Sequence, residues 1–334
     1  MRLSHPTQFR PPFWLRNPHA QTIGQVKLPQ VPLQVARRER LALADGDFVD
    51  IDVGVERDGP VVLMLHGLEG GPHSTYVRGF LQVLAANGFQ AVQMYFRSCS
   101  GEMNRLPRLY HAGGTDDVRA VLKWLAGVWP QRRLGLVGVS LGACVALNLA
   151  REVAEGNPVA NTPAGIVAIS PPFELEACAR MIDGADAKPY REALLGQLIA
   201  KLKRKLADPQ MAAALAAYDI ERAQNAQRIY DFDDAFTAPL HGYASAAAYY
   251  AANSMRERLG CIQIPTRIIH AIDDPLIDPR FLPTPQEAGD HVTLEFSERG
   301  GHVGFLEFRR FKVRRWLERR LPVVLRGLLE GELS

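Results

Sequence analysis

The sequence has no hydrophobic run long enough to cross a membrane. No stretch of the 334 residues approaches the roughly 18 consecutive apolar residues that a spanning helix needs. The first 25 residues are polar and proline-rich, and they lack the apolar core of a signal peptide. We therefore expect a soluble protein located in the cytoplasm.

Cysteine is scarce and scattered. The four cysteines, Cys99, Cys144, Cys178 and Cys261, form no Cys-x-x-Cys pair and no cluster with histidine. Their spacing argues against a zinc site and against a disulfide framework, and it fits a reducing compartment.

The excess of charge of one sign is also small. Lys and Arg total 39 and Asp and Glu total 36, which gives a net charge of +3 with both signs mixed along the chain. Charge therefore gives no reason to expect a nucleic-acid partner. The sequence carries no indication of an oligomeric state.

What the chain does contain is a series of short apolar runs separated by helix-like segments. This pattern predicts an α/β fold with a mostly parallel sheet flanked by helices. The length and the 47% content of hydrophobic residues favour one domain over residues 1–334. The expected strands are 59–67, 88–96, 134–139, 164–170, 265–272 and 291–296, and the clearest helices are 76–87 and 114–127.

The regular alternation is interrupted once. About ninety residues separate the strand that ends near Ser170 from the strand that begins at Pro265, too many for a single crossover helix. We interpret residues 171–262 as an inserted helical lid.

A glycine-flanked serine lies where a predicted strand passes into a predicted helix. In the segment LGLVGVSLGACVA, residues 134–146, Ser140 stands between Gly138 and Gly142. Gly-x-Ser-x-Gly in this setting is typical of a nucleophile elbow, a strained turn that exposes the serine hydroxyl at the edge of the sheet. The glycines would allow strand and helix to approach closely.

A serine nucleophile needs a base and an acid that orients the base. His302 follows the last predicted strand in a glycine-rich loop, and Asp273 and Asp274 follow the strand before it. Because the carboxyl ends of parallel strands meet at one edge, these loops should converge on Ser140. We prefer Asp273, the first of the two after the strand, and interpret Asp274 as a turn residue before Pro275.

An oxyanion site should complete this constellation. The backbone N–H of Leu141, directly after the serine, is the first expected donor. The second is the N–H of Leu68 in the loop LHGLEGG, where Gly67 allows the turn and His66 is expected to hold the loop.

Several motifs in order along nearly the whole chain resemble the YheT-type branch of the α/β-hydrolase superfamily. They are NPHAQT, DGDFVDID, HGLEGGPHSTYVRGF, YFRSCSGEMNRLPRLYHAG, GVSLGA and GGHVGF. The resemblance implies an α/β-hydrolase fold and a hydrolase of carboxylic esters with Ser140, Asp273 and His302 as its triad. It also relates the chain to eukaryotic lipid and acyl-ester hydrolases. Ser98 and the Ala143-Cys144 pair depart from the usual motifs, so we expect these positions to alter the pocket.

The predicted activity is hydrolysis of carboxylic esters through an acyl-enzyme, a chemistry that needs no metal and no cofactor. The Ala- and Leu-rich lid favours acyl or lipid-like esters. A thioesterase, an amidase or an acyltransferase could use the same triad. A ligand-binding sensor with negligible turnover is the alternative outside enzymes.

A basic segment near the C-terminus has two interpretations. The sequence RRFKVRRWLERRL, residues 309–321, interleaves arginines with apolar residues at roughly helical spacing. We favour the last helix of the fold, with one apolar stripe packed on the sheet. The alternative is a basic amphipathic helix in weak peripheral contact with membrane lipid.

Overall fold

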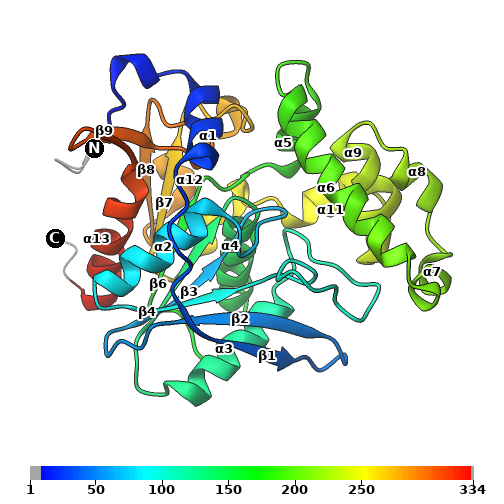
Figure 1. Cartoon of the computed structure of the whole chain (residues 1–334), viewed down its shortest axis with the longest axis horizontal. Helices are drawn as coiled ribbons and strands as arrows, with labels where there is room; N and C mark the ends of the chain where they lie inside the picture. Colours follow the sequence, from blue (N-terminus) through cyan, green and yellow to red (C-terminus); the bar gives the residue numbers. More distant parts are fainter. Residues whose placement is uncertain (1–8, 332–334) are drawn as a thin grey trace.

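The computed structural model describes residues 9–331, and its centre is an eight-stranded sheet in the order β1-β2-β4-β3-β5-β6-β7-β8 (Figure 1). The first two strands join antiparallel, and every pair from β4 to β8 is parallel. The strands are β1 Val35–Ala42, β2 Phe48–Gly54, β3 Val61–Leu65, β4 Gln90–Met94, β5 Leu134–Val139, β6 Gly165–Ile169, β7 Thr266–Ala271 and β8 Val292–Ser297. The predicted α/β class and all six predicted strands are confirmed.

Helices cover both faces of this sheet. On one face α3 (Asp116–Val128) and α4 (Leu141–Ala154) bury their apolar sides, and on the other face α2 (Thr75–Ala86) and α13 (Trp316–Glu330) do the same. The remaining short elements around the sheet are α1 Pro18–Lys27, α12 Pro285–Ala288 and the 3-10 turns Phe13–Leu15, Arg256–Cys261 and Pro279–Phe281. No helix among residues 9–331 is long and apolar enough to span a bilayer.

The segment between β6 and β7 is helical and lies to one side of the sheet (Figure 1). It has an apolar core of its own, built around large side chains such as Leu202, Phe232 and Phe236. Its helices are α5 Leu175–Asp183, α6 Lys188–Leu206, α7 Pro209–Leu215, α8 Ile220–Gln224, α9 Ile229–Phe232, α10 Ala238–Leu240 and α11 Ala246–Asn253, with one π-helical turn at Asp233–Thr237. We refer to residues 171–262 as the insertion.

The basic C-terminal segment is not one helix. Residues 306–309 (β9, Leu306–Arg309) and 312–315 (β10, Lys312–Arg315) form a two-stranded hairpin, and α13 begins only at Trp316. The helical interpretation of 309–321 is therefore wrong for its first half. From Trp316 on, Leu317 and Leu321 pack against the sheet, as expected for the last helix of the fold.

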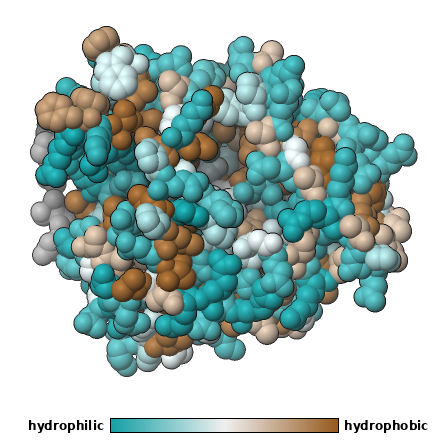
Figure 2. Space-filling model, viewed as in Figure 1, coloured by the Kyte–Doolittle hydropathy of each residue, from teal (hydrophilic) through white to brown (hydrophobic). Residues whose placement is uncertain are grey.

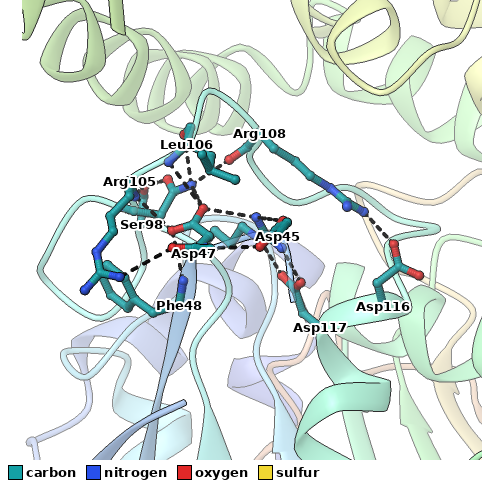
Figure 3. A network of polar contacts seen from close by, with 12 residues as sticks. Asp45, Asp47, Phe48, Ser98, Arg105, Leu106, Arg108, Asp116 and Asp117 are labelled. Carbon is teal, nitrogen blue, oxygen red and sulfur yellow. Dashed lines mark hydrogen bonds and ion pairs between the residues drawn. The ribbon is translucent and has the colours of Figure 1, made fainter. Parts of the chain in front are cut away.

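The loop after β4 is held by buried charges. Arg97 forms ion pairs with Asp45, Asp47 and Asp117, at 2.8, 3.0 and 2.7 Å. Figure 3 shows how Asp45 and Asp47, from the turn before β2, face Asp117 of α3. Because these contacts use its whole guanidinium, Arg97 ties three segments together and does not face the serine.

Candidate active site

Ser140 lies in a sharp turn between β5 and α4. Its backbone has φ 53° and ψ −119°, a conformation that costs a residue other than glycine strain energy. A Cβ on Gly138 would lie 2.4 Å from the carbonyl oxygen of Gly142, and a Cβ on Gly142 would lie 2.5 Å from the carbonyl oxygens of Leu65 and His66. Both glycines are therefore required by close backbone approach, which gives the elbow its shape.

His302 reaches the serine from the loop after β8. Its Nε2 lies 2.9 Å from Ser140 Oγ. Its backbone N–H donates to Thr22 Oγ1 of α1 at 2.9 Å, and a Cβ on Gly301 would lie 2.5 Å from the carbonyl oxygen of Pro18. Helix α1 thus holds the histidine loop, a contact that the NPHAQT motif did not by itself predict.

The acid beside His302 is Asp274, not Asp273. Asp274 Oδ2 lies 2.7 Å from His302 Nδ1, and the Asp274 side chain is fully buried. Its Oδ1 accepts the backbone N–H of Leu276.

Asp273 has a different set of contacts. Its Oδ1 accepts the backbone N–H of Gly301 at 2.9 Å, and Arg299 lies 3.9 Å from its Oδ2. Burial raises the pKa of Asp273, and the hydrogen bond from Gly301 opposes that rise. The preference for Asp273 was wrong because the turn after β7 points these two neighbouring side chains in different directions, and only the second faces the imidazole.

Two backbone amides near the serine are free to donate. Neither the N–H of Leu68 nor that of Leu141 has an acceptor within residues 9–331, whereas the neighbouring Gly67 and Glu69 amides donate to the hydroxyls of Tyr76 and Tyr110. The Leu68 and Leu141 residues line the same cavity as Ser140 and His302. Both amides therefore remain candidates for the predicted oxyanion donors.

His66 supports the loop that carries Leu68. Its Nδ1 contacts the carbonyl oxygen of Gly67 at 2.7 Å, and its Nε2 accepts the N–H of Phe96 at 3.1 Å. Burial lowers the pKa of His66 to about 4, which keeps the ring neutral and able to accept that hydrogen bond at neutral pH. Gly70 is packed against the same ring, since a Cβ there would lie within 3 Å of it.

The same loop is tied to the insertion by a buried ion pair. Lys201 of α6 donates its Nζ to Glu69 Oε1 at 2.7 Å, and the two side chains are 6% and 7% exposed. Tyr110 donates its hydroxyl to that same Oε1 while accepting the N–H of Glu69. Glu69 is the residue next to Leu68. Through this ion pair the insertion therefore helps to fix the position of the loop.

Two cavities meet at this site. The first has a volume of about 250 Å³, contains Ser140 and His302 in its wall, and is closed by apolar side chains of the insertion such as Leu194, Ile229 and Phe236. The second has a volume of about 570 Å³, and its wall includes the cationic residues Lys201 and Arg204. Both cavities are lined by Gln25, Glu69 and Tyr76, which form their common boundary.

The two departures from the family motifs lie in different places. Ser98 lines the second cavity, and so does the neighbouring Cys99, whose Sγ lies 3.1 Å from Lys201 Nζ. Cys144 is buried under the insertion and donates its thiol to the carbonyl oxygen of Pro172, and it lies in neither cavity wall. Cys144 therefore forms no part of either cavity wall, and the expectation that this position alters the pocket stays a prediction. Burial raises the pKa of both thiols, which keeps them protonated and poor nucleophiles.

His270 is a core residue of β7. Its ring packs against Phe173 and Phe296, and neither ring nitrogen has a hydrogen-bond partner within residues 9–331. Burial lowers the pKa of His270 to about 4.

This buried histidine makes stability depend on pH. Below about pH 6.5 the His270 side chain is protonated in the unfolded chain but stays neutral in the folded protein. The free energy of unfolding therefore falls as the pH drops from about 6.5 to 4. His270→Phe should reduce the loss of stability between pH 7 and pH 5 by about 2 kcal/mol. Urea unfolding at both pH values measures this, with His291→Phe, at an exposed position before β8, as the control. An unchanged loss in the His270 variant would contradict the assignment.

Comparisons with known proteins agree with this fold. Residues 60–308 match the family model described as alpha/beta hydrolase fold. The candidate esterase YheT of Escherichia coli (strain K12) is 38% identical over 299 residues, which cover 88% of this chain and 86% of that protein. The monoacylglycerol lipase of Saccharomyces cerevisiae is 28% identical over 261 residues, which cover 77% of this chain and 57% of the lipase.

Solved structures show the same fold. The Pyrococcus furiosus esterase Pf2001 superimposes with a TM-score of 0.53 at 17% identity, over 91% of this chain and 96% of that chain. The chain belongs to the alpha/beta-hydrolase fold family, within its YheT-type branch, and its relatives are carboxylic ester hydrolases.

Proposed function

We propose that this carboxylic ester hydrolase cleaves acyl esters in two steps through an acyl-enzyme on Ser140. The observation that carries the proposal is the continuous chain of contacts from Ser140 Oγ to His302 Nε2, at 2.9 Å, and from His302 Nδ1 to Asp274, at 2.7 Å. This is the arrangement in which an imidazole can remove the serine proton while a carboxylate orients the ring.

In the first step Ser140 Oγ attacks the acyl carbon as His302 takes its proton. The Leu68 and Leu141 amides then hold the oxygen that becomes negative, and Asp274 stabilises the imidazolium. His302 passes the proton to the departing alcohol. In the second step the same histidine activates water, which releases the acid and restores Ser140.

We further propose that the two cavities bind different parts of the substrate. The apolar cavity under the insertion suits an acyl chain, and the second cavity, which has Lys201 and Arg204 in its wall, suits the alcohol part of the ester. The name of the monoacylglycerol lipase relative supports a lipid-like ester as substrate. In this proposal the insertion acts as a lid over the acyl chain, and the four free cysteines support a cytoplasmic location.

A covalent probe tests the acyl-enzyme directly. A fluorophosphonate should add one adduct per chain, and peptide mass analysis should place it on Ser140, because among the serines of residues 9–331 only Ser140 has an imidazole within hydrogen-bond distance of its hydroxyl. A panel of p-nitrophenyl esters and acyl-CoA thioesters of increasing chain length then separates an esterase from a thioesterase. Tight binding of these compounds with no labelling and no turnover would favour the ligand sensor instead.

A further inference from the structure

The hairpin between the sheet and α13 ends in an unusual turn. Arg309 pairs with Lys312 across the hairpin, so that Arg310 and Phe311 form a two-residue turn. Both turn residues have positive φ, 49° and 63°, where hairpins of this kind usually place asparagine and glycine. The Phe311 side chain is 93% exposed. A phenylalanine and an arginine at these positions strain the turn and bury nothing, so fold stability does not explain them.

Other aromatic side chains surround this turn at its base. Phe308 of β9 packs edge-to-face on Trp14, with 5.8 Å between the ring centroids. Both rings stay about half exposed, and the neighbouring Phe13 is 80% exposed. Figure 2 shows hydrophobic atoms gathered at the upper left, over the N-terminal segment and the hairpin of Figure 1. We call Phe13, Trp14, Phe308 and Phe311 the aromatic patch.

Unpaired cations flank the aromatic patch. The exposed side chains of Arg309, Arg310, Lys312 and Arg314 have no acidic partner within residues 9–331. The next arginines along the chain behave differently. Arg315, Arg319 and Arg320 pair with Glu318, Glu307 and Glu295. The free positive charge is therefore concentrated at the hairpin tip.

We propose that the aromatic patch and its arginines dock on an anionic membrane surface. Aromatic rings favour the boundary between lipid headgroups and acyl chains, and clustered Lys and Arg are attracted to anionic headgroups. The charge argues for lipid and against a second copy of this chain, because two such tips would bring like charges together. The contact is made by a hairpin tip and not by an amphipathic helix.

Helix α1 connects this surface with the active site. Gln21 binds the backbone of Leu306 at the start of β9, and Thr22 binds the backbone of His302. Further along the helix, Ile23 and Val26 are exposed, and Val26 lines the second cavity. A membrane under the hairpin would therefore lie beside the cavity proposed for the alcohol part of the substrate.

Vesicle binding tests this surface without any need for hydrolysis, so its outcome is independent of the proposed activity. The vesicles are ether-linked phosphatidylcholine, with or without ether-linked phosphatidylglycerol, so they contain no carboxylic ester. The full chain should cosediment with the anionic vesicles, less with the neutral ones, and less as salt is raised. The double variant Arg310→Asn with Phe311→Gly should bind the anionic vesicles at least tenfold more weakly, since it loses one cation and one inserted ring.

The double variant places preferred residues in the turn, so its melting temperature should equal or exceed that of the wild type. Val128→Asn, an exposed apolar position at the end of α3 and far from the hairpin in Figure 1, is the matched control and should bind as the wild type does. Equal vesicle binding by the wild type and the double variant would overturn the proposal. So would a dimer that the double variant dissociates in sedimentation velocity while vesicle binding stays unchanged.

Discussion

Ser140→Ala should lower kcat for any ester that the enzyme cleaves by at least about ten-thousandfold. The variant keeps the cavities, the two free amides and the His302–Asp274 pair, but it has no oxygen to form the acyl-enzyme. Residual hydrolysis would come from water that the remaining groups activate. Steady-state rates with a p-nitrophenyl ester of suitable chain length measure the loss.

Cys144→Ala is the control for Ser140→Ala. The two positions lie on neighbouring turns of the elbow and helix α4, but the thiol of Cys144 donates to the carbonyl oxygen of Pro172 and Cys144 lines neither cavity. Its kcat should stay within about threefold of the wild type. A Ser140→Ala variant as active as this control would remove the serine from the mechanism.

Asp274→Asn should lower kcat by about ten-thousandfold, whereas Asp273→Asn should lower it by about tenfold or less. An amide at position 274 can donate to Nδ1, which favours the tautomer with its proton on Nε2, the wrong nitrogen for a base facing Ser140. The amide oxygen of asparagine at position 273 can still accept the N–H of Gly301. The pair is a matched comparison, since adjacent residues receive the same chemical change.

The order of these two losses decides the assignment. Thermal unfolding of both variants separates a catalytic effect from a structural one. If Asp274→Asn unfolds at the wild-type temperature and has a low kcat, the loss comes from the orientation of His302 and not from the fold. A larger loss of kcat in Asp273→Asn than in Asp274→Asn would contradict this assignment and make Asp273 the acid of the triad.

The parallel strands and the elbow could be predicted because each leaves a local signal. A strand buried on both faces appears as a continuous apolar run, and Gly138-Val139-Ser140-Leu141-Gly142 follows one such run directly. Antiparallel β1 and β2 were missed for the opposite reason. Arg38 and Arg40 of β1 pair with Asp52 and Asp50 of β2, so the two strands resemble a charged loop until they lie side by side.

The choice of acid and the shape of the basic segment depend on side-chain direction, which the sequence does not fix. Asp273 and Asp274 differ only in which way the turn after β7 points them. In residues 309–315, apolar residues at positions 311 and 313 fit a strand as well as a helix. The strand is formed because β9 pairs with β10 through the turn at Arg310 and Phe311.

The ion pair between Lys201 and Glu69 limits how the enzyme could be re-engineered or recombined. An insertion taken from a relative without a cation at the matching place would leave the buried Glu69 carboxylate with the Tyr110 hydroxyl but no countercharge, one residue from Leu68. The insertion is therefore not an interchangeable module that determines only acyl preference. Substrate range and turnover would change together in such chimeras, unless residues 69 and 201 are exchanged as a pair.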